Sequence, residues 1–145
     1  DRAAPAGGVR VIRQAAVRDR LAEVFTANLR DITVYPRTPT GSINFPCLVI
    51  GMPEWRPHAE HGMDVWTWPI AVCVAMSASA PAAAVDELDA AWPAVAQVLH
   101  QLALVDQTIG GLCSDMIIDS SKFGAVSIAG HDYPAQSIQL KLFDI

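Results

Sequence analysis

The stretch Met63–Met76, MDVWTWPIAVCVAM, alternates between bulky and small side chains. Every second residue from Trp66 to Met76 is large and apolar, and the residues between them are slighter. Side chains on a β-strand point alternately to opposite faces of the sheet. The pattern therefore predicts a long central strand. Its bulky face needs a cover of helices, and its slim face is open to a second layer, a neighbouring subunit or solvent.

Pro69 lies inside this stretch and has no backbone N–H to donate to a β-ladder. The alternation of bulky and small residues nevertheless continues on both sides of it. The sequence therefore predicts a β-bulge that bends the strand at Trp68–Ile70.

Two segments have the spacing of apolar side chains that is typical of amphipathic helices. The first is Val9–Asn28. The second starts near Pro81 and has apolar residues at alternating steps of three and four, namely Val85, Leu88, Trp92, Val95, Leu99 and Leu102. Both helices are expected to pack on the bulky face of the central strand.

The remaining strands are predicted from short apolar or alternating runs, at Ile32–Tyr35, Pro46–Met52, Leu112–Ser121 with Lys122–Ala129, and Tyr133–Phe143. Arg37–Phe45 and Glu54–Gly62 are predicted loops, and Gly130–Asp132 a tight turn. Residues 1–8 are expected to form a flexible arm, and residues 9–145 a single domain. The order of elements predicts an α+β fold, with an antiparallel or mixed β-sheet and two main helices packed on one face.

The length, the cysteine content and the distribution of charge narrow the class of protein further. A chain of 145 residues has the length of one domain, and no apolar run approaches the roughly 20 residues that span a bilayer. Three widely spaced cysteines indicate reduced, buried thiols rather than a disulfide framework. Up to Arg37 there are seven basic residues against four acidic ones, and after it three against eleven. The favoured interpretation is that these are solvated helix charges, and the alternative is a basic patch on one copy that meets an acidic patch on the next.

No catalytic signature stands out. His58-Ala59-Glu60-His61 contains the H-x-E half of the zinc nucleobase deaminase signature, but the P-C-x-x-C half is missing downstream. Solvated loop histidines are the favoured interpretation, so we expect no catalytic, cofactor-binding or metal-binding residue. The alternative is a small metal- or ligand-binding enzyme domain with its site over loops 36–45 and 53–62.

The candidate interface residues are aromatic and arginine side chains, the types that are enriched where proteins meet. Some lie in or beside the two long loops, and others border the apolar stripe of the first helix. They are Arg13, Arg20, Tyr35, Arg37, Phe45, Trp55 and Arg56.

The whole pattern resembles the tail terminator (tail completion) proteins of long-tailed bacteriophages. The resemblance rests on the order of the elements and on the P-x-x-x-x-G-x-P run Pro46–Pro53. The segments that carry it are VYP, FPCLVIG with Pro53 two residues on, WTWPIAVCVAM, VDELDAAWPAV and SIQLKLFDI. It implies a non-enzymatic structural virion protein that caps the tail tube as a hexameric ring. The implied partners are other copies, the tail tube protein and neck or connector proteins. DNA would pass through the lumen without sequence-specific binding, and no membrane would be involved. A head–tail connector or another neck protein is the alternative in this class.

Overall fold

The computed structural model describes residues 13–75 and 81–144. The elements follow in the order α1 (Gln14–Asn28), β1 (Thr33–Tyr35), β2 (Cys47–Ile50), β3 (Glu54–Glu60), β4 (Met63–Cys73), α2 (Pro81–Val105), β5 (Asp115–Ile128) and β6 (His131–Asp144). The predicted arm at residues 1–8 and the predicted start of the first helix, residues 9–12, lie outside the described residues.

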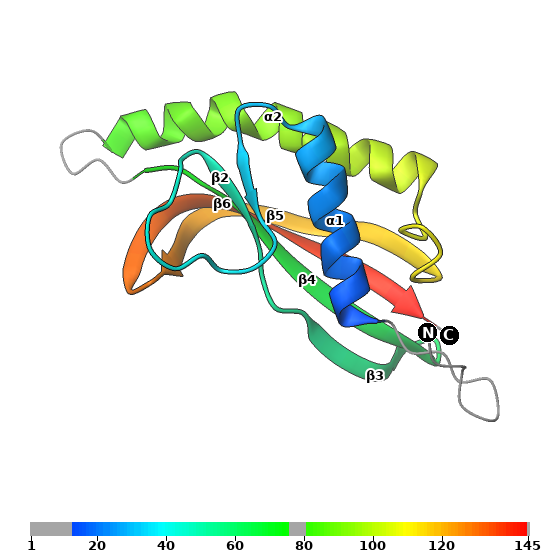
Figure 1. Cartoon of the computed structure of the whole chain (residues 1–145). Coiled ribbons are helices and arrows are strands. Elements are labelled where there is room, and N and C mark those ends of the chain that lie inside the picture. The colour runs from blue at the N-terminus through cyan, green and yellow to red at the C-terminus, as the bar shows by residue number, and fades with distance from the viewer. Residues whose placement is uncertain (1–12, 76–80, 145) are drawn as a thin grey trace.

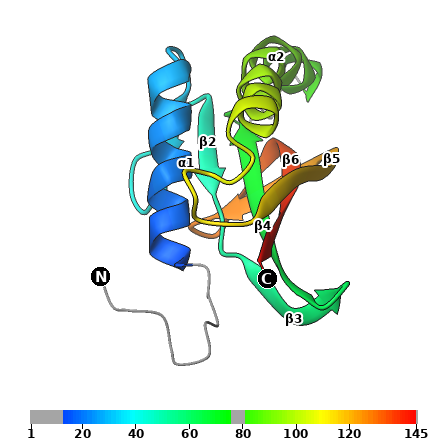
Figure 2. The ribbon, with the colours of Figure 1, turned by 90° about the vertical axis from the view of Figure 1, so that its right-hand side faces the viewer.

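The six strands form one sheet in the order β1-β2-β4-β6-β5, and β3 pairs with a separate part of β4. β1 and β2 run parallel, and every other pair is antiparallel. Both helices lie on one side of this sheet (Figures 1 and 2). The predicted α+β fold, with a mixed sheet and two helices on one face, is confirmed.

The bulky face of β4 forms the main core, as the alternation predicts. Trp68, Ile70 and Val72 are buried there together with Leu21 and Phe25 of α1. The helix α2 adds Ala84, Leu88, Val95, Val98, Leu99 and Leu102. Full burial of one large apolar side chain is worth about 1.5–3 kcal/mol, so these contacts hold both helices on the sheet. The expected stripe of α2 is wrong at its first position, because Val85 is 43% exposed and Ala84 is buried instead.

The slim face of β4 is covered at its C-terminal end by the chain's own loop, residues 36–46. A second buried cluster joins Ala71 and Cys73 to neighbouring strands, and Ile43 and Phe45 of the loop pack against it. Farther along the strand, Thr67 and Pro69 are only partly buried. The slim face is therefore a second packed layer at one end and a partly open surface at the other.

Pro69 causes no β-bulge, so that prediction is wrong. The register between β4 and β6 runs without a shift from Asp64 to Cys73. Toward the opposite side, the N–H of Gly51 donates to the carbonyl of Pro69 at 2.8 Å. Because the N and O of one strand residue point to the same side, the missing N–H of Pro69 faces β2 and not β6. The position without an N–H donor lies between the end of β2 and the start of β3. Neither strand therefore loses a hydrogen bond of its pairing with β4.

Glu54–Gly62 is a second correction, because residues 54–60 form strand β3 and not a loop. β3 pairs with β4 from Glu54↔Thr67 to Glu60↔Met63, with a register shift in between. It extends the sheet into a hairpin arm that projects away from both helices (Figure 2). Gly62 at the arm's tip has φ +76°, a conformation that favours glycine.

In the last hairpin, the sequence leaves open whether residues 122–129 continue the preceding strand or form another, and the structure shows one continuous strand, β5, with a register shift between Ile118 and Ser120. The position of the turn differs from the prediction. The turn falls at Ala129–Gly130, where φ is 52° and 82°, and not at Gly130–Asp132. Two consecutive residues of positive φ make the tight connection that suits the twist of paired strands.

Candidate assembly surface

Large exposed apolar side chains gather at three separate places on the surface. Met52 and Trp55 lie at the base of the β3 arm, Leu104 and Val105 lie at the end of α2, and β5 carries Ile117, Ile118 and Phe123. Contiguous exposed apolar groups mark interaction sites more often than single ones do. These three places are therefore the candidate contact surfaces of the chain.

The base of the arm carries what we call the tryptophan patch, formed by Arg18, Met52, Trp55, Trp66 and Trp68. The rings of Trp55 and Trp66 lie 6.0 Å apart and are tilted by 32°. The guanidinium of Arg18 lies 5.6 Å from the centre of the Trp68 ring, and its Nη2 donates to the sulfur of Met52 at 3.5 Å. Met52 is 68% exposed and Trp55 is 50% exposed, so the outer side of the patch faces solvent.

The tryptophan patch is rich in hydrogen-bond donors and poor in acceptors. Nε of Arg18 and Nε1 of Trp66 and Trp68 are buried and have no hydrogen-bond partner. Among residues 13–75 and 81–144, Nη2 of Arg18 donates to a thioether, which is a weak acceptor. Most buried polar groups in folded proteins are paired, so three unpaired donors in one place require a physical explanation. Nη2 of Arg18 is not among these buried atoms, so it is the donor of the patch that suits a partner with a stronger acceptor.

The edge of the sheet at β5 is the second candidate surface. β5 is a 14-residue strand, and one of its edges pairs with β6 while no strand within the described residues pairs with the other. Phe123 is 56% exposed on this strand. A long edge with exposed apolar side chains is a template for pairing with another chain, and Lys122 and the register shift near Asp119 are features that limit such pairing.

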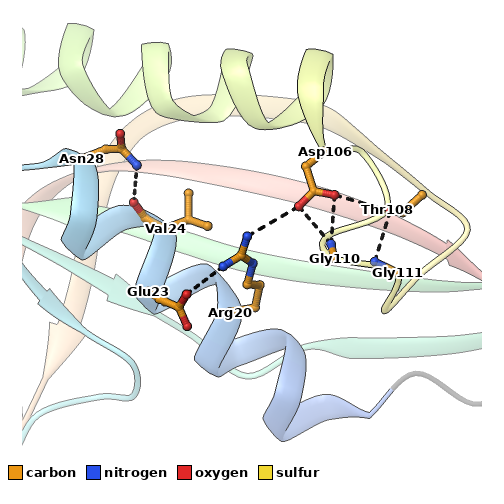
Figure 3. A network of polar contacts seen from close by, with 8 residues as sticks. All are labelled: Arg20, Glu23, Val24, Asn28, Asp106, Thr108, Gly110 and Gly111. Carbon is orange, nitrogen blue, oxygen red and sulfur yellow. Dashed lines mark hydrogen bonds and ion pairs between the residues drawn. The ribbon is translucent and has the colours of Figure 1, made fainter.

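The third surface is a groove of about 610 Å³ between α1 and α2. Its apolar lining includes Val24, Val98 and Leu102. At one end, Arg20 forms an ion pair with Glu23 at 2.7 Å and lies 3.9 Å from Asp106 (Figure 3). These side chains are partly exposed to solvent, so the ion pairs add little stability.

Asp106 organises the loop that follows α2. Both of its carboxylate oxygens accept the backbone N–H of Gly110 at 2.9 Å, and the Thr108 hydroxyl donates to Oδ1 at 3.4 Å (Figure 3). Ile109, Gly110 and Gly111 all have positive φ, between 50° and 82°. The carboxylate therefore holds this turn in place, and Asp106 itself lines the groove.

The seven predicted interface residues divide into three groups, of which the first lies on the candidate surfaces and the second is packed inside the chain. Trp55 belongs to the tryptophan patch, and Arg20 lines the groove. Tyr35 and Phe45 instead pack within the chain, where Phe45 lies 4.9 Å from the ring of Tyr133 and the hydroxyl of Tyr35 accepts the N–H of Asn44 at 3.0 Å.

The three remaining arginines lie apart from one another. Arg13 immediately precedes α1, and Arg37 is exposed in the loop after β1. Arg56 is exposed on β3 and pairs with Glu54 at 3.0 Å. The structure does not gather the predicted arginines into one site. Sequence reasoning missed Met52 and the contact of Arg18 with Trp68, although Arg18 borders the apolar stripe of α1.

The histidine cluster lies at the tip of the arm. The N–H of His58 donates to Asp64 at 3.0 Å, and its Nδ1 lies 3.2 Å from the carbonyl of Gly62. Across residues 13–75 and 81–144, no group of three or more His, Cys, Asp or Glu side chains is arranged to hold a metal ion. The contacts of His58 give it a structural part in the hairpin.

The cysteines are free and buried, and Cys47 lies directly opposite Cys73 on β2 and β4. The hydrogen bond to Cys47, together with burial, raises the pKa of Cys73 far above its ordinary value. A thiol that stays protonated is a poor nucleophile. The same hydrogen bond lowers the pKa of Cys47, so the protonated state is assigned to Cys73 alone.

No protein-family model matches the sequence, and no curated protein matches it either. No helix in the part of the chain that the structure describes is long and apolar enough to cross a membrane. Function is therefore inferred from the chain's own surfaces.

Proposed function

We propose that this chain is a structural virion protein of the tail terminator type, which caps the tail tube of a long-tailed phage and joins it to the head or neck. The chain acts by assembly and not by catalysis. Its binding partners are other copies of the same chain, which form a ring, and the tail tube and neck proteins on the two sides of that ring. DNA passes through the lumen without sequence-specific binding.

One observation carries this proposal, namely that exposed apolar groups lie on three separate elements of one small domain, at the base of the β3 arm, at the end of α2 and on β5. A ring subunit in a stack needs two lateral surfaces and at least one axial surface. The lateral surfaces must differ from each other, because a ring closes through heterologous contacts. The tryptophan patch at the arm is one candidate lateral surface, and the edge of β5 is a different surface that remains for another contact.

The resemblance in element order to tail terminator proteins supports the same function. Both helices lie on one face of a mixed sheet, and a hairpin arm extends beyond them (Figure 1). The uneven distribution of charge along the sequence favours contacts between copies.

Deleting the gene in its phage tests the proposal directly. We expect tails of uncontrolled length, or tails that fail to join heads, and recovery of normal particles when the wild-type gene is supplied in trans. Normal tails and infectious particles after deletion would refute the proposal.

The position of the protein in particle images separates the two phage assignments. A tail terminator forms density at the junction of the tail tube and the neck. A head–tail connector forms density on the head side of that junction, and finding the protein only there would replace the terminator assignment with the connector assignment.

A further inference from the structure

We propose that the tryptophan patch binds the acidic start of α2 of a second copy, so that successive subunits of the ring are joined head to tail. The acidic start of α2 is defined here as Val85, Asp86, Glu87 and Asp89. This inference rests on the proposed ring and names the two surfaces that meet in it.

The acidic start of α2 carries three carboxylates on an exposed helix surface. Val85 is 43% exposed, and Asp86, Glu87 and Asp89 are exposed as well, while Leu88 between them is buried in the core. Among the described residues, none of these carboxylates forms an ion pair or accepts a hydrogen bond from a side chain. The surface thus offers an apolar group surrounded by strong, unused acceptors.

The tryptophan patch has the complementary properties. It offers exposed apolar area at Met52 and Trp55 and the positive charge of Arg18. A carboxylate is a much stronger acceptor for a guanidinium than the thioether that contacts Arg18 now. An incoming carboxylate can displace the exposed Met52 side chain and take its place at Nη2. Charge, polarity and donor–acceptor balance therefore all favour this pair of surfaces.

The two surfaces lie apart on the molecule. α2 begins at one end of the domain, and β3, whose base carries the tryptophan patch, projects away from α2 in both views (Figures 1 and 2). One copy therefore cannot satisfy its own patch with its own α2. A contact between unlike surfaces repeats from copy to copy and closes into a ring when the rotation between copies permits.

Photo-cross-linking tests which surfaces meet. Trp55 is replaced with p-benzoylphenylalanine, and in a second variant Met52 is replaced, because both side chains are exposed and tolerate a bulky group. Each variant is mixed with ¹⁵N-labelled wild-type chain, irradiated, digested and analysed by mass spectrometry. The isotope label separates links between copies from links within one copy. We expect links between copies to a peptide that contains residues 82–92.

Native mass spectrometry of the same samples reports the assembly state. An oligomer that cross-links at another segment, or only to a different protein in assembled particles, overturns the docking of α2 and leaves the ring standing. A chain that stays monomeric at all concentrations overturns the docking and also removes the support for a self-assembling ring. The two failures are therefore distinguishable.

Charge reversal supplies a second test with a matched control. The variant Asp86→Lys with Glu87→Lys should weaken self-association by at least about tenfold. The control Asp31→Lys with Asp132→Lys changes the net charge equally at exposed positions outside both surfaces. Equal self-association of both variants would overturn the inference, because net charge alone would then explain any effect.

Discussion

Replacing Gly51 with alanine should destabilise the protein, because this glycine is in close contact with Pro69. A Cβ built at Gly51 lies 2.8 Å from Cγ of Pro69 and 3.2 Å from its carbonyl oxygen. Two carbon atoms in favourable contact are about 3.5–4.0 Å apart, so the added methyl is about 0.7 Å too close. The proline ring is tied to the backbone and cannot rotate away. The two strands must therefore move apart.

The magnitude follows from two opposing terms. Overpacking of this kind costs about 1–3 kcal/mol, while alanine lowers the entropy of the unfolded chain and returns about 0.4–1 kcal/mol. The net loss in the free energy of unfolding is then about 1–2 kcal/mol. It lowers the melting temperature by roughly 2–8 °C for a chain of this length. Urea unfolding and thermal melts measure both quantities, at one protein concentration because assembly would shift the midpoint.

Gly124→Ala is the matched control. A Cβ at Gly124 on β5 meets no atom within 4 Å, and this glycine does not have a positive φ. The control variant should be as stable as the wild type or more stable, by up to about 1 kcal/mol.

A double-mutant cycle isolates the contact between residue 51 and the pyrrolidine ring of Pro69. In a Pro69→Ala background the Cγ atom is gone, so Gly51→Ala should cost at least about 1 kcal/mol less than it does in the wild type. An equal cost in both backgrounds, or a Gly51→Ala variant as stable as Gly124→Ala, would refute the close-contact explanation.

Three further predictions concern the loop after α2, the second buried cluster and the thiols. Asp106→Ala should cost about 1–3 kcal/mol, because it leaves the N–H of Gly110 without its acceptor, and hydrogen exchange should accelerate at residues 107–111. Arg20→Ala, which removes only partly exposed ion pairs, should cost less than about 1 kcal/mol; a larger loss than that of Asp106→Ala would contradict the assigned roles. Phe45→Ala should cost about 1–3 kcal/mol in urea unfolding, less than the roughly 3–5 kcal/mol of a fully buried phenylalanine, and no loss would mean that loop 36–46 does not hold the cluster. Ellman's reagent should label no thiol in the native protein and three in denaturant, and rapid native labelling would contradict the burial of the cysteines, which are Cys47, Cys73 and Cys113.

The central strand could be predicted because its bulky and small side chains alternate, and the two sets face different environments. The bulky residues of Met63–Cys73 face the helices, and the small residues face the loop or solvent. β3 could not be predicted in the same way. The segment Glu54–Glu60 has charges and a proline but no apolar alternation, and all but its last residue are exposed. It is a strand because the edge of β4 is vacant where β2 ends, which is a tertiary effect that local propensity does not record.

The candidate surface was predictable only in part, for a similar reason. Trp55 could be chosen because an aromatic residue in a polar, charged segment has few local partners. Met52 and Arg18 are 34 residues apart in the sequence, and they meet only because α1 crosses the sheet beside the start of β3. Tyr35 and Phe45 are also of residue types that are common at interfaces, but they pack against the second buried cluster of the same chain. Composition alone does not distinguish these two outcomes.

The junction at Gly51 and Pro69 connects the fold to the proposed assembly. Because Pro69 cannot donate a hydrogen bond, β2 ends there and a new strand, β3, takes over the same edge of β4. That change of strand carries the arm beyond the cover of the helices and exposes Met52, which directly follows Gly51, and Trp55. A shift at this junction must therefore move the tryptophan patch. The Gly51→Ala variant should accordingly lose self-association as well as stability, whereas Gly124→Ala should change neither by more than the small amount expected for the control.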